Sequence, residues 1–171
     1  MNQQNELFAP IISLEDFAAD RASGTDFGIL GLTSGGFDPI HPGHLSCLVD
    51  SKNYCDTLVV VVNGDWFLEH NRGRHFMNLQ TRCEIVAAVR GVDVVVPFEI
   101  KNDLTVCKAL EAIKPDVFTK GGDRSDAETI PEWDICLDNG IDIQLGVGDS
   151  KTHSSTNLLE DWYEARLRLF F

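Results

Sequence analysis

Short apolar runs and helical patterns alternate along this chain of 171 residues. Five of the runs are rich in β-branched residues, which is typical of strands buried on both faces of a sheet. They cover residues 27–33, 57–63, 92–97, 116–119 and 141–145. Helical patterns lie between them at about residues 44–53, 78–90, 103–113 and 131–139. This order predicts an α/β fold, a Rossmann-like doubly wound parallel sheet of about five strands with helices on both faces.

The length predicts a single domain over residues 1–171, since one core of ordinary size accounts for it. We expect an N-terminal helix at about residues 13–22, a core at about 26–150 and a C-terminal helix at about 155–171. No apolar run approaches the roughly 18 residues that span a bilayer, and no secretory signal opens the chain. A cytoplasmic protein without a membrane partner is therefore expected. The five cysteines are scattered without a Cys-x-x-Cys pair, which predicts reduced thiols rather than disulfides or a zinc site.

A turn rich in glycine and histidine follows the first predicted strand. Over residues 35–44 it reads Gly-Gly-Phe-Asp-Pro-Ile-His-Pro-Gly-His. Glycine lets a backbone approach an anion, and the helix expected beyond the turn offers unpaired N–H groups and the positive end of its dipole. Pro42 suits the first helical turn, and a spacing of three places His41 and His44 on the same side of it. The turn therefore predicts a phosphate site that two imidazoles face.

A second glycine turn, Lys120-Gly121-Gly122-Asp123, follows the fourth predicted strand. Parallel strands end at one edge of a sheet, and ligands bind there, where the winding reverses. Both turns are therefore expected at the same edge.

The net charge of −13 argues against a nucleic acid or an anionic membrane as a partner, because both require a basic face. Residues 70–90 are an exception, with Arg72, Arg74, Arg82 and Arg90 against a single acidic residue, Glu84. Solvated helix faces explain Arg72, Arg74 and Arg90 as well as ligand binding does. The loop at residues 70–77 is interpreted either as a lid over a bound nucleotide or as an ordinary connection.

The pattern Gly-Phe-Asp-x-x-His-x-Gly-His resembles the phosphate-binding motif of a nucleotidyltransferase superfamily. That superfamily includes cytidylyltransferases, pantetheine-phosphate adenylyltransferase and heptose 1-phosphate adenylyltransferases. The segments at residues 120–123 and 154–157, the second reading Ser-Ser-Thr-Asn, resemble Lys-Gly-Gly-Asp and Ser-Thr-Thr-Asn of the heptose branch. The likeness runs from about residue 13 to about residue 160.

The resemblance implies roles for particular residues. His41 and His44 would donate to phosphate oxygens, and Arg82 resembles an arginine that opens the corresponding helix and binds phosphate there; these three form the expected catalytic set. The N–H groups that cap the last helix would also bind phosphate. The expected nucleotide-binding residues are Thr33, Gly35, Gly36, Phe37, Asp38, Gly43, Lys120, Gly121, Gly122, Asp123, Ser154, Ser155 and Thr156.

The implied reaction transfers a nucleoside monophosphate from NTP, with ATP favoured, to a sugar 1-phosphate of the heptose type, and releases pyrophosphate. The acceptor phosphate is already ionised because its second pKa is about 6, so no general base is needed. Mg²⁺ would arrive with the NTP, and no protein-only metal site is expected. Two alternatives stay open: a CTP-dependent enzyme acting on an alcohol phosphate such as glycerol 3-phosphate, and a nucleotide-binding module of the same fold without turnover.

The C-terminal helix carries apolar residues at helical spacing, which predicts a stripe that faces the core. Its apolar end, Leu169-Phe170-Phe171, is unusual because chain ends are normally polar. This end leads us to consider a homodimer.

Overall fold

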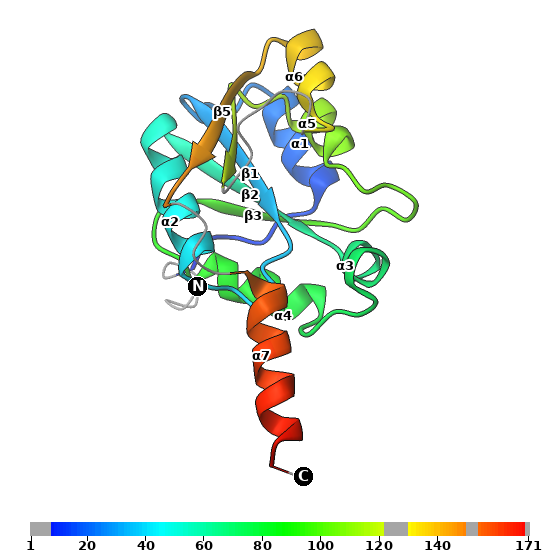
Figure 1. Cartoon of the computed structure of the whole chain (residues 1–171). Helices are drawn as coiled ribbons and strands as arrows, with labels where there is room; N and C mark the ends of the chain where they lie inside the picture. Colours follow the sequence, from blue (N-terminus) through cyan, green and yellow to red (C-terminus); the bar gives the residue numbers. More distant parts are fainter. Residues whose placement is uncertain (1–7, 122–129, 150–153, 170–171) are drawn as a thin grey trace, which may run out of the picture.

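A five-stranded sheet forms the centre of the protein in a computed structural model that describes residues 8–121, 130–149 and 154–169. All neighbouring strands are parallel, in the order β3-β2-β1-β4-β5 (Figure 1). The strands are β1 Leu30–Gly35, β2 Thr57–Asn63, β3 Val94–Phe98, β4 Val117–Gly121 and β5 Asp142–Val147. The predicted Rossmann-like doubly wound fold is confirmed.

The winding of the sheet reverses at β1. This strand pairs with β2 on one side, where Leu30 faces Thr57, and with β4 on the other, where Gly31 faces Val117. The chain therefore builds outward from β1 in both directions and leaves a crevice beyond the carboxyl ends of β1 and β4. Both predicted glycine turns begin at this edge.

Helices cover both faces of the sheet (Figure 1). One face carries α1 Leu14–Ala22, α5 Cys107–Ile113 and α6 Trp133–Asn139, and the other carries α2 Pro42–Ser51 and α4 Leu79–Ala87. The remaining helices are η2 Lys52–Tyr54, α3 Asp65–Arg72 and α7 Ser155–Leu167. No helix in the described part of the chain is both long enough and apolar enough to cross a bilayer.

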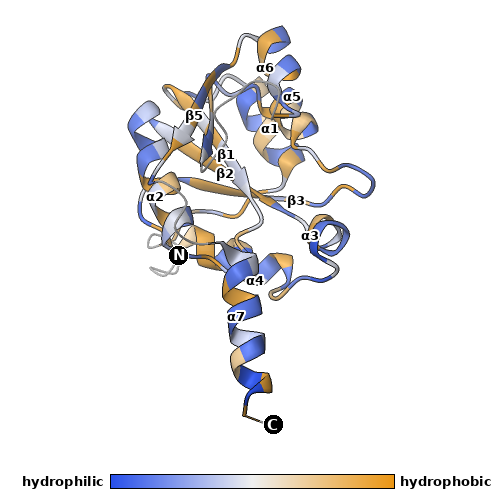
Figure 2. Ribbon diagram, viewed as in Figure 1, coloured by the Kyte–Doolittle hydropathy of each residue, from blue (hydrophilic) through white to orange (hydrophobic). Residues whose placement is uncertain are grey.

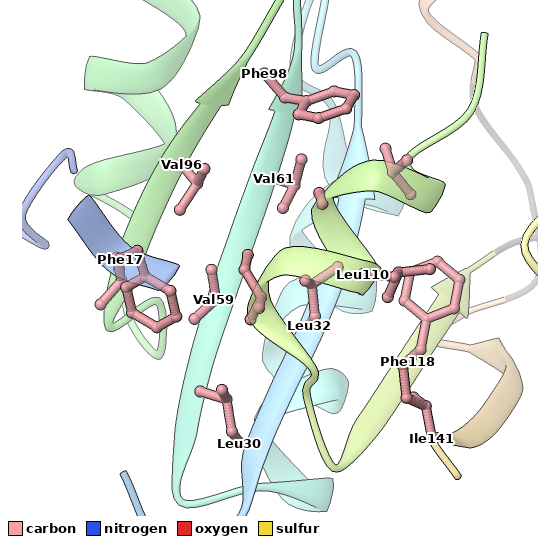
Figure 3. Close-up of a cluster of buried hydrophobic side chains, with 14 of the residues drawn as sticks. Phe17, Leu30, Leu32, Val59, Val61, Val96, Phe98, Leu110, Phe118 and Ile141 are labelled. Atoms are coloured by element: carbon pink, nitrogen blue, oxygen red, sulfur yellow. The ribbon is translucent and has the colours of Figure 1, made fainter. Parts of the chain in front are cut away.

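Two hydrophobic clusters hold the layers together, because successive side chains of a strand point to opposite faces. Val59 and Val61 of β2 pack with α1, α5 and α6, whereas Leu58, Val60 and Val62 pack with α2 and α4. Figure 3 shows the first cluster, in which α5 crosses the strands. The near-continuous apolar runs of the sequence therefore belong to strands covered on both sides.

The first predicted strand and the third predicted helix begin later than expected. Residues 27–29 precede β1 because Gly28 has a φ of +61° and donates its N–H to Asp26. In α5 the delay comes from Asp103, whose carboxylate accepts from the backbone N–H and the hydroxyl of Thr105 and holds a turn there. Local side-chain hydrogen bonds thus shorten both elements.

Helix α3 was not predicted. Gly64 stands at its N-cap without a side chain, and the carboxylate of Glu99 accepts from the N–H of Trp66 in its first turn. The cap therefore comes from a residue beyond the end of β3, which no local pattern reveals.

Helix α7 projects away from the sheet and its covering helices (Figure 1). Ser155 is its one buried residue, and the Trp162 side chain is 58% exposed. The prediction that this helix turns an apolar stripe toward the core is wrong.

Candidate nucleotide-binding site

A cavity of about 410 Å³ opens at the carboxyl edge of the sheet, at the reversal point. It is walled by the end of β1 with the turn after it, the first turns of α2, the end of β4 and the start of α7. Residues from the end of β2, from α3 and from just beyond β5 complete the lining. Of the expected residues, the cavity is lined by His41, His44, Thr33, Gly35, Gly36, Phe37, Gly43, Lys120, Gly121, Ser154, Ser155 and Thr156. Gly122 and Asp123 lie outside the described residues.

The rings of His41 and His44 stack at the start of α2, with centroids 3.8 Å apart and planes 26° from parallel. His41 is the N-cap and Pro42 the first helical residue. Gly43 lies between the two histidines, and a Cβ there would be in tight contact with the His41 ring, 3.1 Å from its Cε1. Phe37 supports the pair from the other side, with its ring 5.0 Å from that of His44. The motif thus places two imidazoles together on the cavity wall.

His44 is held in its neutral form. Burial lowers the pKa of His44 to about 3, and the charges of His41 and Arg72 act in the same direction. Its Nδ1 atom is buried and has no hydrogen-bond partner among the described residues. Packing rather than a hydrogen bond therefore fixes the ring, and one of its nitrogens carries a proton that it can donate.

The first turn of α7 is tied to the motif turn. Ser155 donates a hydrogen bond from Oγ to the carbonyl of Pro39 over 2.9 Å, and Ser154 caps the helix by accepting from the N–H of Asn157. Ser154, Ser155 and Thr156 line the same cavity as the two histidines. The first N–H groups of a helix lack partners within it, so a turn of this kind is suited to an anion.

Lys120 brings a positive charge to the end of β4. Its Nζ donates to Oγ of Ser34 over 3.3 Å and lies 3.5 Å from Oε2 of Glu132, a carboxylate that is itself buried. The ammonium also lies 5.0 Å from the ring centroid of Phe118. Glu132 accepts from the N–H of Val106. Glu132, which lies outside the motif at residues 120–123, therefore holds Lys120 at the cavity wall.

Arg82 does not line the cavity, contrary to the prediction. Its side chain is fully buried, and it donates to the carbonyls of Met77, Gly36 and Asn63 and to the carboxylate of Asp65. With these protein acceptors engaged and no exposed surface, its guanidinium cannot reach a ligand. Arg82 instead joins the motif turn to the end of β2 and the start of α3.

Asp38 also serves the protein rather than the cavity. Its buried carboxylate accepts from the N–H groups of Phe76 and Met77, over 2.7 and 2.8 Å. Asp38 was expected to contact the nucleotide. Its carboxylate instead holds the loop at residues 73–77 through these two hydrogen bonds.

Arg72 lines the cavity although the sequence did not single it out. It ends α3 and donates from Nη1 to the carbonyl of Asp38 over 3.1 Å. The basic composition of residues 70–90 was the available signal, but it could not separate Arg72 from Arg74 and Arg90, which do not line the cavity. Asn63 and Phe67, on and after β2, are further lining residues that the motif did not predict.

Cys47 of α2 lies against the end of β4, at Gly121, and against Gly148, just beyond β5. A Cβ on Gly121 would come within 2.6 Å of its Sγ, and one on Gly148 within 2.7 Å of its backbone nitrogen. These glycines allow α2 to approach the sheet edge closely. Burial raises the pKa of the Cys47 thiol, which therefore stays protonated in the cavity wall.

The charge of the lining suits an anion. Lys120 and Arg72 are cationic, and Asp149 is the one carboxylate in the described lining. Among the residues that the structure describes, no group of three or more His, Cys, Asp or Glu side chains is placed to hold a metal ion. Two cationic side chains thus line the cavity of a chain of net charge −13, and Lys120 is paired with Glu132 just outside the lining.

A doubly wound parallel sheet with a cavity at its reversal point is the arrangement typical of α/β nucleotide-binding proteins. The family model described as "Cytidylyltransferase-like" matches residues 32–147, which is more than half of the chain. The chain belongs to the cytidylyltransferase-like family and is a nucleotidyltransferase.

Curated relatives carry the name "Bifunctional protein HldE". The protein from Hyphomonas neptunium is 35% identical over 132 residues, which cover 76% of this chain and 26% of the relative. The one from Caulobacter vibrioides is 36% identical over 132 residues, with the same two shares. The chain therefore spans about a quarter of the length of these relatives.

Solved structures share the fold. A lipopolysaccharide core biosynthesis protein from Thermoplasma volcanium has a TM-score of 0.61 and 27% identity, over 71% of this chain and 98% of its own. A pantoate-beta-alanine ligase from Francisella tularensis has a TM-score of 0.62 over 88% of this chain and 73% of its own. At 17% identity, the second likeness concerns the fold alone.

Proposed function

We propose that this enzyme transfers a nucleoside monophosphate, AMP from ATP, to a sugar 1-phosphate of the heptose type. The observation that carries the proposal is the stacked pair of His41 and His44, which shares one cavity with Lys120 and the first turn of α7. Binding a triphosphate requires several hydrogen-bond donors that point to one place, with no cluster of carboxylates facing them. The lining of this cavity has that composition.

The reaction is an in-line displacement at the α-phosphorus. An oxygen of the acceptor phosphate forms the new P–O bond, and the bond to the bridging β-oxygen breaks, so that pyrophosphate leaves with the electron pair. His41 and His44 donate to α- and β-phosphate oxygens as charge shifts toward the leaving group. The start of α7 and the Arg72 guanidinium hold the departing pyrophosphate, while Lys120 binds beside the ribose and base.

No protein base is needed, because the acceptor phosphate is a dianion near neutral pH. Magnesium would enter with the triphosphate and keep most of its waters. Asp149 lines the cavity and would accept hydrogen bonds from those waters, and one carboxylate cannot form a metal cage alone.

Four observations support a sugar 1-phosphate as acceptor. The segments at residues 120–123 and 154–157 resemble the heptose branch. The relatives named HldE match most of this chain, and the Thermoplasma volcanium neighbour is titled a lipopolysaccharide core biosynthesis protein. In cytidylyltransferases an arginine precedes the Ser/Thr run, whereas Asp149-Ser150-Lys151 stands here.

The test is a panel of the four common NTPs against heptose 1-phosphates, hexose 1-phosphates and glycerol 3-phosphate, with pyrophosphate release as the readout. We expect release only with ATP and a sugar 1-phosphate. Turnover with CTP and glycerol 3-phosphate would show that these are the donor and the acceptor, in place of ATP and a sugar 1-phosphate. Tight nucleotide binding without pyrophosphate from any pair would indicate a binding module.

A further inference from the structure

Strand β2 ends on a buried amide, the side chain of Asn63. The strand is hydrophobic from Leu58 to Val62 (Figure 2), and Asn63 is its last residue. The residue is 8% exposed, and its backbone carbonyl accepts a hydrogen bond from Arg82 over 2.6 Å. Its side-chain amide, however, forms no hydrogen bond with any residue that the structure describes. Buried amides in proteins are normally hydrogen-bonded, which indicates that the partner of this one is a ligand.

Asn63 lies on the cavity wall, on the opposite side of β1 from Lys120. Asn63, Ser34 and Lys120 each stand two residues beyond a member of the first hydrophobic cluster, so their side chains lie on the same face of the sheet. Their strands run in the order β2-β1-β4 with about 4.8 Å between neighbours, which separates Asn63 from Lys120 by about 10 Å across the sheet. Lys120 donates to Ser34. This face of the wall therefore has a cation at β4 and a neutral amide at β2.

The reaction requires a place for the acceptor, and the end of β2 fits it. The inference rests on the proposed function, in which the nucleoside lies beside Lys120 and the phosphates lie along the histidines and the start of α7. The acceptor phosphate must approach the α-phosphorus in line, from the side opposite the departing pyrophosphate. Asn63 and Phe67 line a part of the wall that this arrangement gives to neither the nucleoside nor the pyrophosphate.

The side chains of Asn63 and Phe67 match a sugar better than a phosphate. An amide donates through Nδ2 and accepts through Oδ1, and a hydroxyl group can return both kinds of bond, whereas a phosphate dianion only accepts. Phe67, half-buried in the first turn of α3, offers an apolar ring to the C–H faces of a sugar. We propose that Asn63 and Phe67 form the sugar subsite of the acceptor. The amide binds one hydroxyl group, and the phenyl ring packs against the sugar ring.

Neither side chain of this sugar subsite is charged, and this determines what the subsite distinguishes. An acceptor without the matching hydroxyl group leaves the Asn63 amide buried and unpaired, so it binds more weakly. Acceptors that share the 1-phosphate but differ in a hydroxyl group are therefore separated at the end of β2. The choice among nucleoside triphosphates is made at the other side of the cavity, beside Lys120.

Substitution of Asn63 separates the two substrates. Asn63→Leu removes the amide, nearly keeps its volume and leaves the backbone carbonyl that Arg82 uses. With the sugar 1-phosphate that is converted fastest, KM for the acceptor should rise about tenfold, while KM for ATP should change by less than about twofold. The melting temperature should not fall, because the amide has no partner to lose among the described residues. Asn139→Leu, the same change at an exposed amide of α6, is the control and should alter neither KM.

Deoxysugar 1-phosphates identify the hydroxyl group. In the unsubstituted enzyme, removal of one particular hydroxyl should lower kcat/KM for the acceptor about tenfold, and in Asn63→Leu the same removal should lower it by less than about twofold. A residue that only supports the fold would not show this dependence on a single hydroxyl group. Phe67→Leu should raise KM roughly fivefold for all these acceptors alike, because Phe67 acts on the sugar ring.

Failure of the sugar subsite is distinguishable from failure of the proposed function. If a sugar 1-phosphate is converted but Asn63→Leu keeps its KM for the acceptor, the subsite alone is overturned. Equal increases in KM for the acceptor and for ATP would also overturn it, because they would indicate a general change of the cavity.

If no sugar 1-phosphate is converted, the proposed function is wrong, and calorimetry still tests Asn63. The probe is glucose 1-phosphate, titrated into the full chain in the presence of a non-hydrolysable ATP analogue. Weaker binding to Asn63→Leu than to the unsubstituted chain would support the sugar subsite. No binding to either, or equal dissociation constants, would overturn it.

Discussion

The 3.8 Å separation of the His41 and His44 rings means that neither histidine acts independently of the other. His41→Ala and His44→Ala should each lower kcat at least about a hundredfold, because each removes a donor to the transition state. Nucleotide affinity should change only modestly, since Lys120, Arg72 and the start of α7 stay in place. Turnover and equilibrium nucleotide binding measure the two quantities. A variant with near-normal turnover would contradict the proposed role of the pair.

Arg72 and Arg74 provide a matched comparison. Both are exposed arginines close in sequence, but only Arg72 lines the cavity. Arg72→Gln should weaken ATP binding and kcat/KM by about tenfold, the usual worth of one charge-assisted contact. Arg74→Gln should change both by less than about twofold. Equal losses in the two variants would indicate a general electrostatic effect instead of a contact.

The lowered pKa of His44 makes stability depend on pH in a defined direction. In the unfolded chain a histidine takes up a proton below about pH 6.5, whereas folded His44 does so only near pH 3. The contribution of His44 is therefore complete above pH 6.5 and is lost as the pH falls from 6.5 toward 3. Its slope is at most about 1.4 kcal/mol per pH unit, the value for one proton.

Urea unfolding at pH 7, 6 and 5 measures this effect. The free energy of unfolding should fall less steeply in His44→Gln than in the unsubstituted chain, because other groups contribute equally to both. If the free energy of unfolding fell equally steeply with pH in the two proteins, His44 would not be held neutral by the fold.

At the scale of the element, α3 is the helix that the sequence did not predict. The strands and most helices follow from local periodicity, and the stacked histidines follow from a spacing of three residues. Helix α3 depends on Glu99, which lies 33 residues from the Trp66 N–H that it caps. Without this helix in the prediction, Asp65 could not be recognised as the partner of Arg82, nor Arg72 as a cavity residue.

The same omission explains the error at Arg82. A motif identifies an arginine near a phosphate site, but burial decides whether its donors face the ligand or the protein. Here they satisfy the carbonyls of Gly36, Asn63 and Met77, which belong to three separate segments. Sequence reasoning lacked the contacts between those segments.

Replacement of Arg82 tests its structural role. Arg82→Met leaves three backbone carbonyls and Asp65 without their donor and should lower the free energy of unfolding by about 3 kcal/mol. Arg82→Lys should recover only part of this, since one ammonium cannot replace the guanidinium geometry. Chemical denaturation gives the values. If Arg82→Met kept full stability and lost only turnover, the result would indicate that Arg82 binds phosphate and has no structural role.

At the scale of the whole molecule, the acidic charge and the anionic substrate are compatible because charge is distributed unevenly. The chain carries −13 in total, yet the described cavity wall holds Lys120 and Arg72 against Asp149. The edge of the sheet where this pocket lies was predictable, since parallel strands end together and the winding reverses at β1. The direction of α7 was not predictable. An apolar stripe indicates that a helix packs against another surface, but it does not say which surface that is.

The close approach of Cys47 to the end of β4 and to Gly148 has a practical consequence. Cys47 lines the cavity, so bound ATP should shield its thiol from an alkylating reagent such as iodoacetamide. Cys55 and Cys107 do not line the cavity and should react at the same rate with or without nucleotide. Peptide mass spectrometry follows each site, and equal labelling of Cys47 in both conditions would place the nucleotide elsewhere. A native thiol can therefore report occupancy before any acceptor is known.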